Sequence, residues 1–201
     1  MNDDDQVMDK SALALTLFFL AGLLVADCRR GFADDLGHLP RVGVYGITKE
    51  EYSEARVWLA RACVAEEGWG DRGGCSAVAH AYGRRHLLRR PISLRETIKG
   101  HAAALRDRGS YSTRQLFIRE LPTNASPSQQ ADFAATLTLL DRWYQGRVKD
   151  PCAPHQVTDF GSSSDPAPLG GTRVHCSGGD NRFYVIDREL AREKRRASAT
   201  R

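Results

Sequence analysis

The chain has 201 residues, of which 41% are apolar and 27% are charged. These values suit one globular domain with its own core and a short appendage. The formal net charge is only +4, and much of the basic excess lies in residues 188–201, which we interpret as a solvated helix end or tail. No recognised nucleic-acid-binding motif accompanies this tail, so no specific nucleic-acid partner is expected. There are no internal repeats.

Residues 11–26 form an uncharged apolar segment. Its length is near the short limit for a membrane-spanning helix, which needs about 20 apolar residues. We expect an N-terminal hydrophobic helix that serves as a membrane anchor or uncleaved signal; a cleaved signal and a buried core helix are the alternatives. The predicted organisation is a tail and hydrophobic segment over 1–27, a Gly- and Pro-containing linker over 28–47, a folded domain over 48–187, and a basic tail over 188–201.

Helix boundaries are marked by capping residues. Thr48 and Glu51 have the capping-box spacing, so a helix is predicted from there to Gly68. Further helices are predicted over about 74–89, ended by a proline, over 94–108, over 112–121 and over 126–145. Residues 150–181 are rich in Gly, Ser, Pro and Asp and are predicted to be a loop, and 182–187 to be a short strand. The expected fold is therefore mainly α, in the α+β class.

Five cysteines are present. Cys28 lies at the end of the apolar segment. If the domain lies outside the cytoplasm, Cys63–Cys75 and Cys152–Cys176 are the expected disulfides, because each closes a short local loop; free buried thiols are the alternative. No Cys/His spacing typical of zinc is present, so no metal and no cofactor are expected.

An acid pair, Glu66 and Glu67, ends the first predicted helix and is followed by a Gly-rich turn. Glu66 continues the apolar face of this helix. Partial burial raises the pKa of a carboxyl group, because it disfavours the charged form. A carboxyl that stays protonated near neutral pH can act as a general acid. The alternative is a solvated acid at a helix end.

Three segments resemble a known family in the same order along the chain. They are Leu59-Ala60-Arg61-Ala62 leading to Glu66, then Asp150-Pro151-Cys152 followed by Thr158-Asp159-Phe160, and finally Asp180-Asn181-Arg182-Phe183-Tyr184. Together they resemble the SleB/CwlJ-type cell-wall hydrolases, across about residues 50–186. The chain departs from that family at Glu67–Gly70, at Asp159 and at Asn181 or Arg182, where the family has other residues, two of them histidines.

The resemblance implies a lysozyme-like helical domain that cleaves the glycan strands of peptidoglycan, with Glu66 as the catalytic residue. Since no clear second carboxylate appears, a lytic transglycosylase is favoured over a hydrolase. Substrate binding is assigned to two kinds of residue. Thr158 and Asn181 would hydrogen-bond the N-acetyl groups. The aromatic rings would stack on the sugars, with packing in the core as the alternative, and belong to Tyr82, Phe160, Phe183 and Tyr184. Peptidoglycan and, through the N-terminal segment, the membrane are the expected partners, in the cell envelope, in secreted form or in a virion. The alternative is a degenerate, non-catalytic module that binds wall glycan or serves an envelope or virion assembly.

Overall fold

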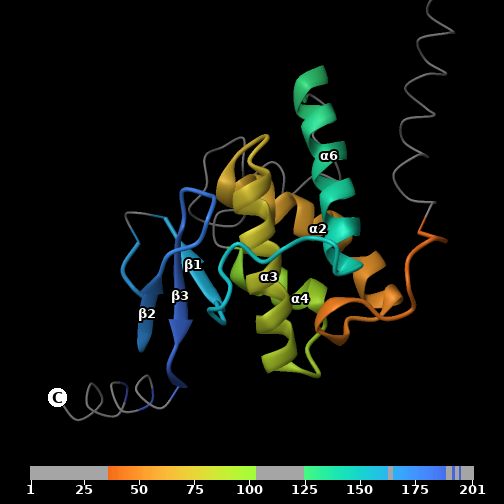
Figure 1. Ribbon diagram of the computed structural model, residues 1–201. Helices are drawn as coiled ribbons and strands as arrows, with labels where there is room; N and C mark the ends of the chain where they lie inside the picture. Colours follow the sequence, from red (N-terminus) through yellow and green to blue (C-terminus); the bar gives the residue numbers. More distant parts are fainter. Residues whose placement is uncertain (1–35, 103–124, 163–164, 189–191, 193–194, 196–201) are drawn as a thin grey trace, which may run out of the picture. The chain divides into compact units, whose positions relative to one another are not determined.

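A computed structural model describes residues 36–102, 125–162, 165–188, 192 and 195 (Figure 1). The chain divides into two compact units, Met1–His38 and Leu39–Arg201, and the fold below is that of the second unit. The predicted hydrophobic helix over 11–26 and the predicted helix over 112–121 lie outside the described residues. Among the helices that the structure describes, none is long and apolar enough to cross a membrane.

Helix α2 (Lys49–Glu67) begins and ends as the sequence predicts. The Thr48 hydroxyl accepts a hydrogen bond from the backbone N–H of Glu51, and the Glu51 carboxylate accepts one from the N–H of Thr48, which completes a capping box. Gly68 ends the helix with a φ of 87°, a backbone conformation that glycine adopts without strain. The acid pair therefore occupies the last turn of the helix.

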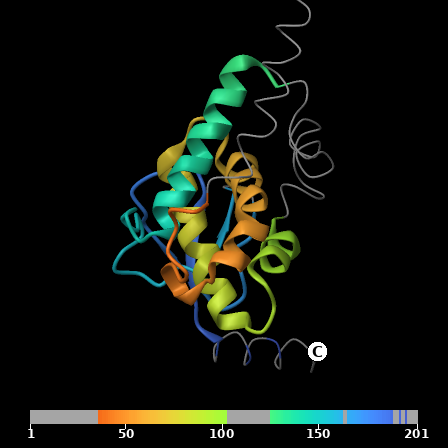
Figure 2. The same cartoon turned by 90° about the vertical axis from the view of Figure 1, so that its right-hand side faces the viewer.

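Helix α3 (Arg72–Arg89) is the centre of the fold. Asp71 caps it by accepting a hydrogen bond of 2.8 Å from the N–H of Gly74. Every residue from Gly74 to His86 is buried, which is possible because most of its first half consists of glycine, alanine and other small residues. Figures 1 and 2 show the small sheet along one side of α3 and the other helices around the rest of it.

Two more helices complete the described helical part. Helix α4 (Leu94–His101) begins after Ser93, and helix α6 (Pro127–Tyr144) begins after Ser126 with a capping box to Gln129. Both starts agree with the sequence prediction. Helix α4 ends at His101, with Ala102 as its C-cap, and is therefore shorter than the predicted helix over 94–108. Tyr144 on α6 stacks on Tyr52 of α2 at a centroid distance of 4.4 Å.

Three short strands form one antiparallel sheet in the order β1-β3-β2. They are β1 (Asp159–Gly161), β2 (Gly171–Val174) and β3 (Arg182–Ile186). Strand β3 was predicted, but β1 and β2 lie inside 150–181, which was predicted to be loop throughout. That prediction was wrong because strands of three and four residues are too short to show an alternating apolar pattern. The result is a mainly helical α+β fold, as predicted.

The folded part begins earlier than the predicted boundary at Thr48. Leu39 and Ile47 are buried, and a 3-10 turn, η1 (Val44–Gly46), lies between them. Gly43 packs so closely against the ring of Tyr144 that a Cβ atom would overlap it. The glycines that gave this stretch the composition of a linker therefore include one that close packing requires.

Candidate functional site

The last turn of α2 carries Glu66 at the end of a buried face. Tyr52, Ala55, Leu59 and Ala62 recur at three- and four-residue steps on this face and are all fully buried. Glu66 is the next position in the same series and is half-buried. A carboxyl in this position is only partly removed from water, at the point where an apolar surface ends.

The neighbouring Glu67 is held on both of its carboxylate oxygens. Oε1 accepts a hydrogen bond of 2.8 Å from Nδ2 of Asn181, and Oε2 accepts one of 3.1 Å from the backbone N–H of Asp180. The carboxylate also lies against Gly74 and Gly179, where added Cβ atoms would come within 2.5 and 2.6 Å of Oε2. Burial raises the pKa of Glu67 above its usual value, while the two hydrogen bonds act in the opposite direction.

Asn181 joins the end of α2 to the start of β3. Its Nδ2 donates to the backbone carbonyl oxygen of Glu66 at 3.0 Å as well as to Glu67. One turn earlier, the Cys63–Cys75 disulfide links α2 to α3, with 4.7 Å between the two Cα atoms. The backbone that carries Glu66 is therefore fixed from two directions, by a covalent bond and by a side-chain amide.

Both predicted disulfides are present. The second, Cys152–Cys176, joins the segment before β1 to the loop after β2, with 4.2 Å between the Cα atoms. Beside this loop lies a hollow of about 520 Å³, whose lining includes Arg173, His175 and Asn181. The hollow contains no residue of α2, but Asn181 connects it to the turn of Glu66.

The predicted sugar-binding aromatics lie mostly in the core. The ring of Tyr82 contacts Phe160 edge to face at 5.4 Å, and Phe160 contacts Phe183 at 6.1 Å. Tyr82, Phe183 and Tyr184 are 0%, 2% and 5% exposed, so their rings offer almost no face to a ligand. Phe160 is half-buried, which makes it the predicted aromatic residue with the most accessible ring.

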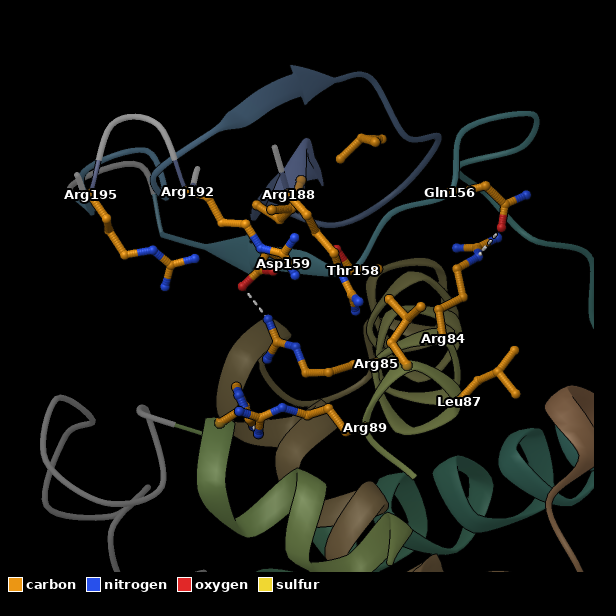
Figure 3. A pocket seen from close by; sticks show the side chains of 14 residues that line it. Arg84, Arg85, Leu87, Arg89, Gln156, Thr158, Asp159, Arg188, Arg192 and Arg195 are labelled. Atoms are coloured by element: carbon orange, nitrogen blue, oxygen red, sulfur yellow. Dashed lines mark hydrogen bonds and ion pairs between the residues drawn. The ribbon is translucent and has the colours of Figure 1, made fainter. Parts of the chain in front are cut away.

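Thr158 and Asp159 lie in a second, larger cavity of about 710 Å³ at the other end of the sheet (Figure 3). The N–H of Thr158 donates to the carbonyl of Tyr184 at 3.2 Å, which aligns this segment with β3. Asp159 forms an ion pair with Arg85 of α3. Thus Thr158 and Asn181 were both predicted to bind sugar substituents, but the structure places them at opposite ends of the sheet rather than together.

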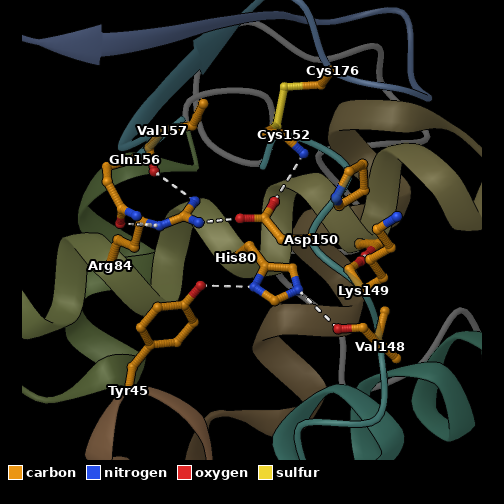
Figure 4. Close-up of polar contacts among 12 residues, drawn as sticks. Tyr45, His80, Arg84, Val148, Lys149, Asp150, Cys152, Gln156, Val157 and Cys176 are labelled. Carbon is orange, nitrogen blue, oxygen red and sulfur yellow. Dashed lines mark hydrogen bonds and ion pairs between the residues drawn. A yellow bond between two sulfur atoms is a disulfide. The ribbon is translucent and has the colours of Figure 1, made fainter. Parts of the chain in front are cut away.

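A polar network on α3 was not predicted from the sequence (Figure 4). Arg84 donates to Asp150, to Oε1 of Gln156 and to the carbonyl of Val157, so it holds the chain segment that leads into β1. The only sequence signal was the pair of adjacent arginines, Arg84 and Arg85, in the second half of the helix. Both are buried and both form ion pairs.

His80, also on α3, lies close to this network (Figure 4). Its Nδ1 lies 2.7 Å from the hydroxyl of Tyr45, and its Nε2 lies 3.3 Å from the carbonyl of Val148. Burial lowers the pKa of His80 and raises that of Tyr45 to about 12, so both side chains are neutral at physiological pH. With both ring nitrogens engaged, this histidine serves packing and alignment.

Within the described residues, no group of three or more His, Cys, Asp or Glu side chains is arranged to hold a metal ion. Comparisons of the chain with family models, with curated proteins and with solved structures found no match.

Proposed function

We propose that this protein cleaves the glycan strands of peptidoglycan as a lytic transglycosylase, with Glu66 as the general acid and base. One observation carries the proposal: the three segments of the resemblance, far apart in sequence, pack around α3. Asn181 bonds the turn that carries Glu66, and Phe160 and Phe183 pack together beside Tyr82. The third segment therefore meets the turn of Glu66, whereas Thr158 of the second segment lies at the opposite end of the sheet.

The proposed reaction requires a single carboxyl group. Protonated Glu66 donates its proton to the glycosidic oxygen as the bond from that oxygen to C1 of muramic acid breaks. The resulting carboxylate then accepts the proton of the C6 hydroxyl of the same sugar, whose oxygen attacks C1. The products are two shorter strands, one of which ends in a 1,6-anhydro sugar. Glu66 is protonated again, and no water is consumed.

Glu67 has a different role in this proposal. Both of its oxygens accept hydrogen bonds, one from the Asn181 side chain and one from the Asp180 backbone. Glu67 therefore anchors the loop before β3 to the helix end. It is a positioning residue, and Glu66 on the same turn remains the acid.

The proposed location is the cell envelope, with the apolar segment over 11–26 as a membrane tether. Two disulfides are typical of proteins in oxidising compartments. Peptidoglycan lies in such a compartment, so the location and the proposed substrate agree.

The alternative is a non-catalytic module that binds wall glycan. One contact favours it: Asp159 occupies the place of a histidine in the resemblance and is engaged by Arg85. A carboxylate held in an ion pair is not available as a base. In a binding module, the residues that contact the glycan would be kept and the catalytic function would be lost.

Substitution of the two acids separates these functions. Full-length protein in a non-ionic detergent is mixed with purified peptidoglycan, and release of soluble fragments is measured for the parent, Glu66→Gln and Glu67→Gln. We expect Glu66→Gln to lose roughly 100-fold or more of the activity, the usual contribution of a general acid. Glu67→Gln should retain a measurable fraction, because the acid itself is intact.

The matched control is Glu54→Gln, an exposed glutamate on the same helix, which should be fully active. Equal digestion by the parent and by Glu66→Gln contradicts the catalytic assignment. A parent protein that binds peptidoglycan but releases no fragments supports the binding module instead.

A further inference from the structure

The larger cavity is strongly basic. Its volume is about 710 Å³, and it lies where the end of α3 meets the end of β3 and the first residues after it. Six arginines line it: Arg84, Arg85, Arg89, Arg188, Arg192 and Arg195. Figure 3 shows all six labelled around the opening.

Among the described residues that line the cavity, only one carries a carboxylate. This residue, Asp159, forms an ion pair with Arg85. Arg84 forms an ion pair with Asp150, which does not line the cavity. Arg188 and Arg192 also line the cavity and are exposed. Positive charge in a concavity attracts anions, because the surrounding low-dielectric walls focus the field.

The cavity also has an aliphatic wall. Val185 and Ile186 of β3 line it together with Leu87 and Leu88 of α3. The two leucines are 48% and 50% exposed. A ligand that fits here carries several carboxylate or other anionic groups and small apolar groups between them.

Strand β3 connects the cavity to the proposed site. Strand β3 runs from Asn181, which holds the turn of Glu66, to Ile186 in the cavity lining. At about 3.3 Å per residue the two ends are roughly 16 Å apart. Thr158, predicted to bind the glycan, is itself a lining residue.

We propose that this cavity binds the carboxylate groups of the acidic stem peptides that peptidoglycan strands carry. This inference rests on the proposed function, because it assumes a peptidoglycan strand as ligand. Guanidinium groups pair with carboxylates through two parallel hydrogen bonds. Alanine methyl groups of the peptide match the aliphatic wall. The protein would then distinguish peptide-bearing strands from strands without peptides.

The test is calorimetric titration of the full-length Glu66→Gln variant in a non-ionic detergent, which keeps the ligand intact. Two ligands are compared: a disaccharide that carries its acidic tetrapeptide, and the same disaccharide without the peptide. We expect roughly tenfold tighter binding of the peptide-bearing ligand at low salt. The preference should decrease strongly at high salt, because salt screens charges near the surface.

Removal of charge identifies the cavity. Arg188→Ser combined with Arg192→Ser should abolish the preference and leave the affinity for the bare disaccharide unchanged. The matched control is Arg142→Ser with Arg147→Ser, which removes two exposed arginines that do not line the cavity. This control should keep the preference.

Equal affinity for both ligands, or an undiminished preference in the double variant, overturns the proposal. Tighter binding of a short DNA duplex or of a phosphate-rich wall polymer, lost in the same double variant, overturns it in favour of a phosphate polyanion. Failure of the proposed function alone gives a different result. The parent then cleaves no strands, but the preference for the peptide-bearing ligand persists and depends on Arg188 and Arg192.

Discussion

At the scale of single residues, the two adjacent acids have different surroundings. Glu66 ends a buried apolar face, whereas Glu67 is fixed by Asn181 and Asp180 and pressed between two glycines. The two side chains leave the helix in different directions, because successive residues are about 100° apart around the helix axis. Two adjacent residues therefore have different proposed roles: Glu66 is the acid, and Glu67 anchors the loop before β3.

The raised pKa of Glu67 predicts a specific pH dependence of stability. Because the folded state holds this proton to higher pH than the unfolded state, ionisation of Glu67 costs stability as the pH rises from about 4.5, its usual value, through the raised pKa. Glu67→Gln removes this cost. The melting temperature of the variant, relative to the parent, should therefore be higher at pH 7 than at pH 4.

The comparison with the parent isolates Glu67 from the histidines. Burial lowers the pKa of His80 and His86, so their contribution to stability is lost as the pH falls below about 6.5. That effect is common to the parent and the variant and cancels in the difference. A difference in melting temperature that is the same at both pH values would show that Glu67 has no shifted pKa.

At the scale of elements, the link between α2 and α3 holds the candidate site. Cys63 and Cys75 join the two helices next to the turn of Glu66, and Asn181 joins the same turn to β3. The site is thus supported by two consecutive helices and by a strand that lies far along the chain from them.

Loss of this covalent link should lower stability. The Cys63–Cys75 bond closes a loop with a sequence separation of 12, for which chain entropy predicts a contribution of roughly 3 kcal/mol. The double variant Cys63→Ser, Cys75→Ser should lower the free energy of unfolding by about this amount in urea denaturation. Cys28→Ser, which removes the remaining cysteine, serves as the control. A double variant as stable as the parent would mean that the bond contributes nothing to the fold.

The helices could be predicted from sequence because their ends are chemically marked. Thr48, Ser93 and Ser126 cap the three helices that were predicted to start there. The strands β1 and β2 could not be predicted, because their pairing with β3 joins residues that share no local pattern. The packed segment before Thr48 was missed for a similar reason: Gly43 fits against Tyr144, which lies far along the chain.

The candidate site was predictable only in part. The position of Glu66 follows from helical phase, and the disulfides follow from short spacing. Tyr82 and Phe183 are buried, but tyrosine and phenylalanine also occur as exposed residues that stack on sugars. The sequence alone therefore did not show whether these residues lie in the core or in a binding groove. The basic cavity combines Arg85 of α3 with Arg188 and Arg192 after β3, a juxtaposition that only the fold creates.

At the scale of the whole molecule, the unit Leu39–Arg201 combines a central buried helix, a small sheet and two disulfides. The proposed acid lies near one end of the sheet and the basic cavity near the other. In this account, the glycan is cleaved at the first place and its peptide is held at the second.

Mass spectrometry of the fragments released from purified peptidoglycan tests the central claim most directly. We expect fragments with 1,6-anhydromuramyl ends from the parent protein, and none from Glu66→Gln. Anhydro ends produced equally by Glu66→Gln would contradict the role of Glu66. Fragments that have incorporated water at a reducing end would contradict the transglycosylase reaction, and the absence of any released fragment would contradict glycan cleavage itself.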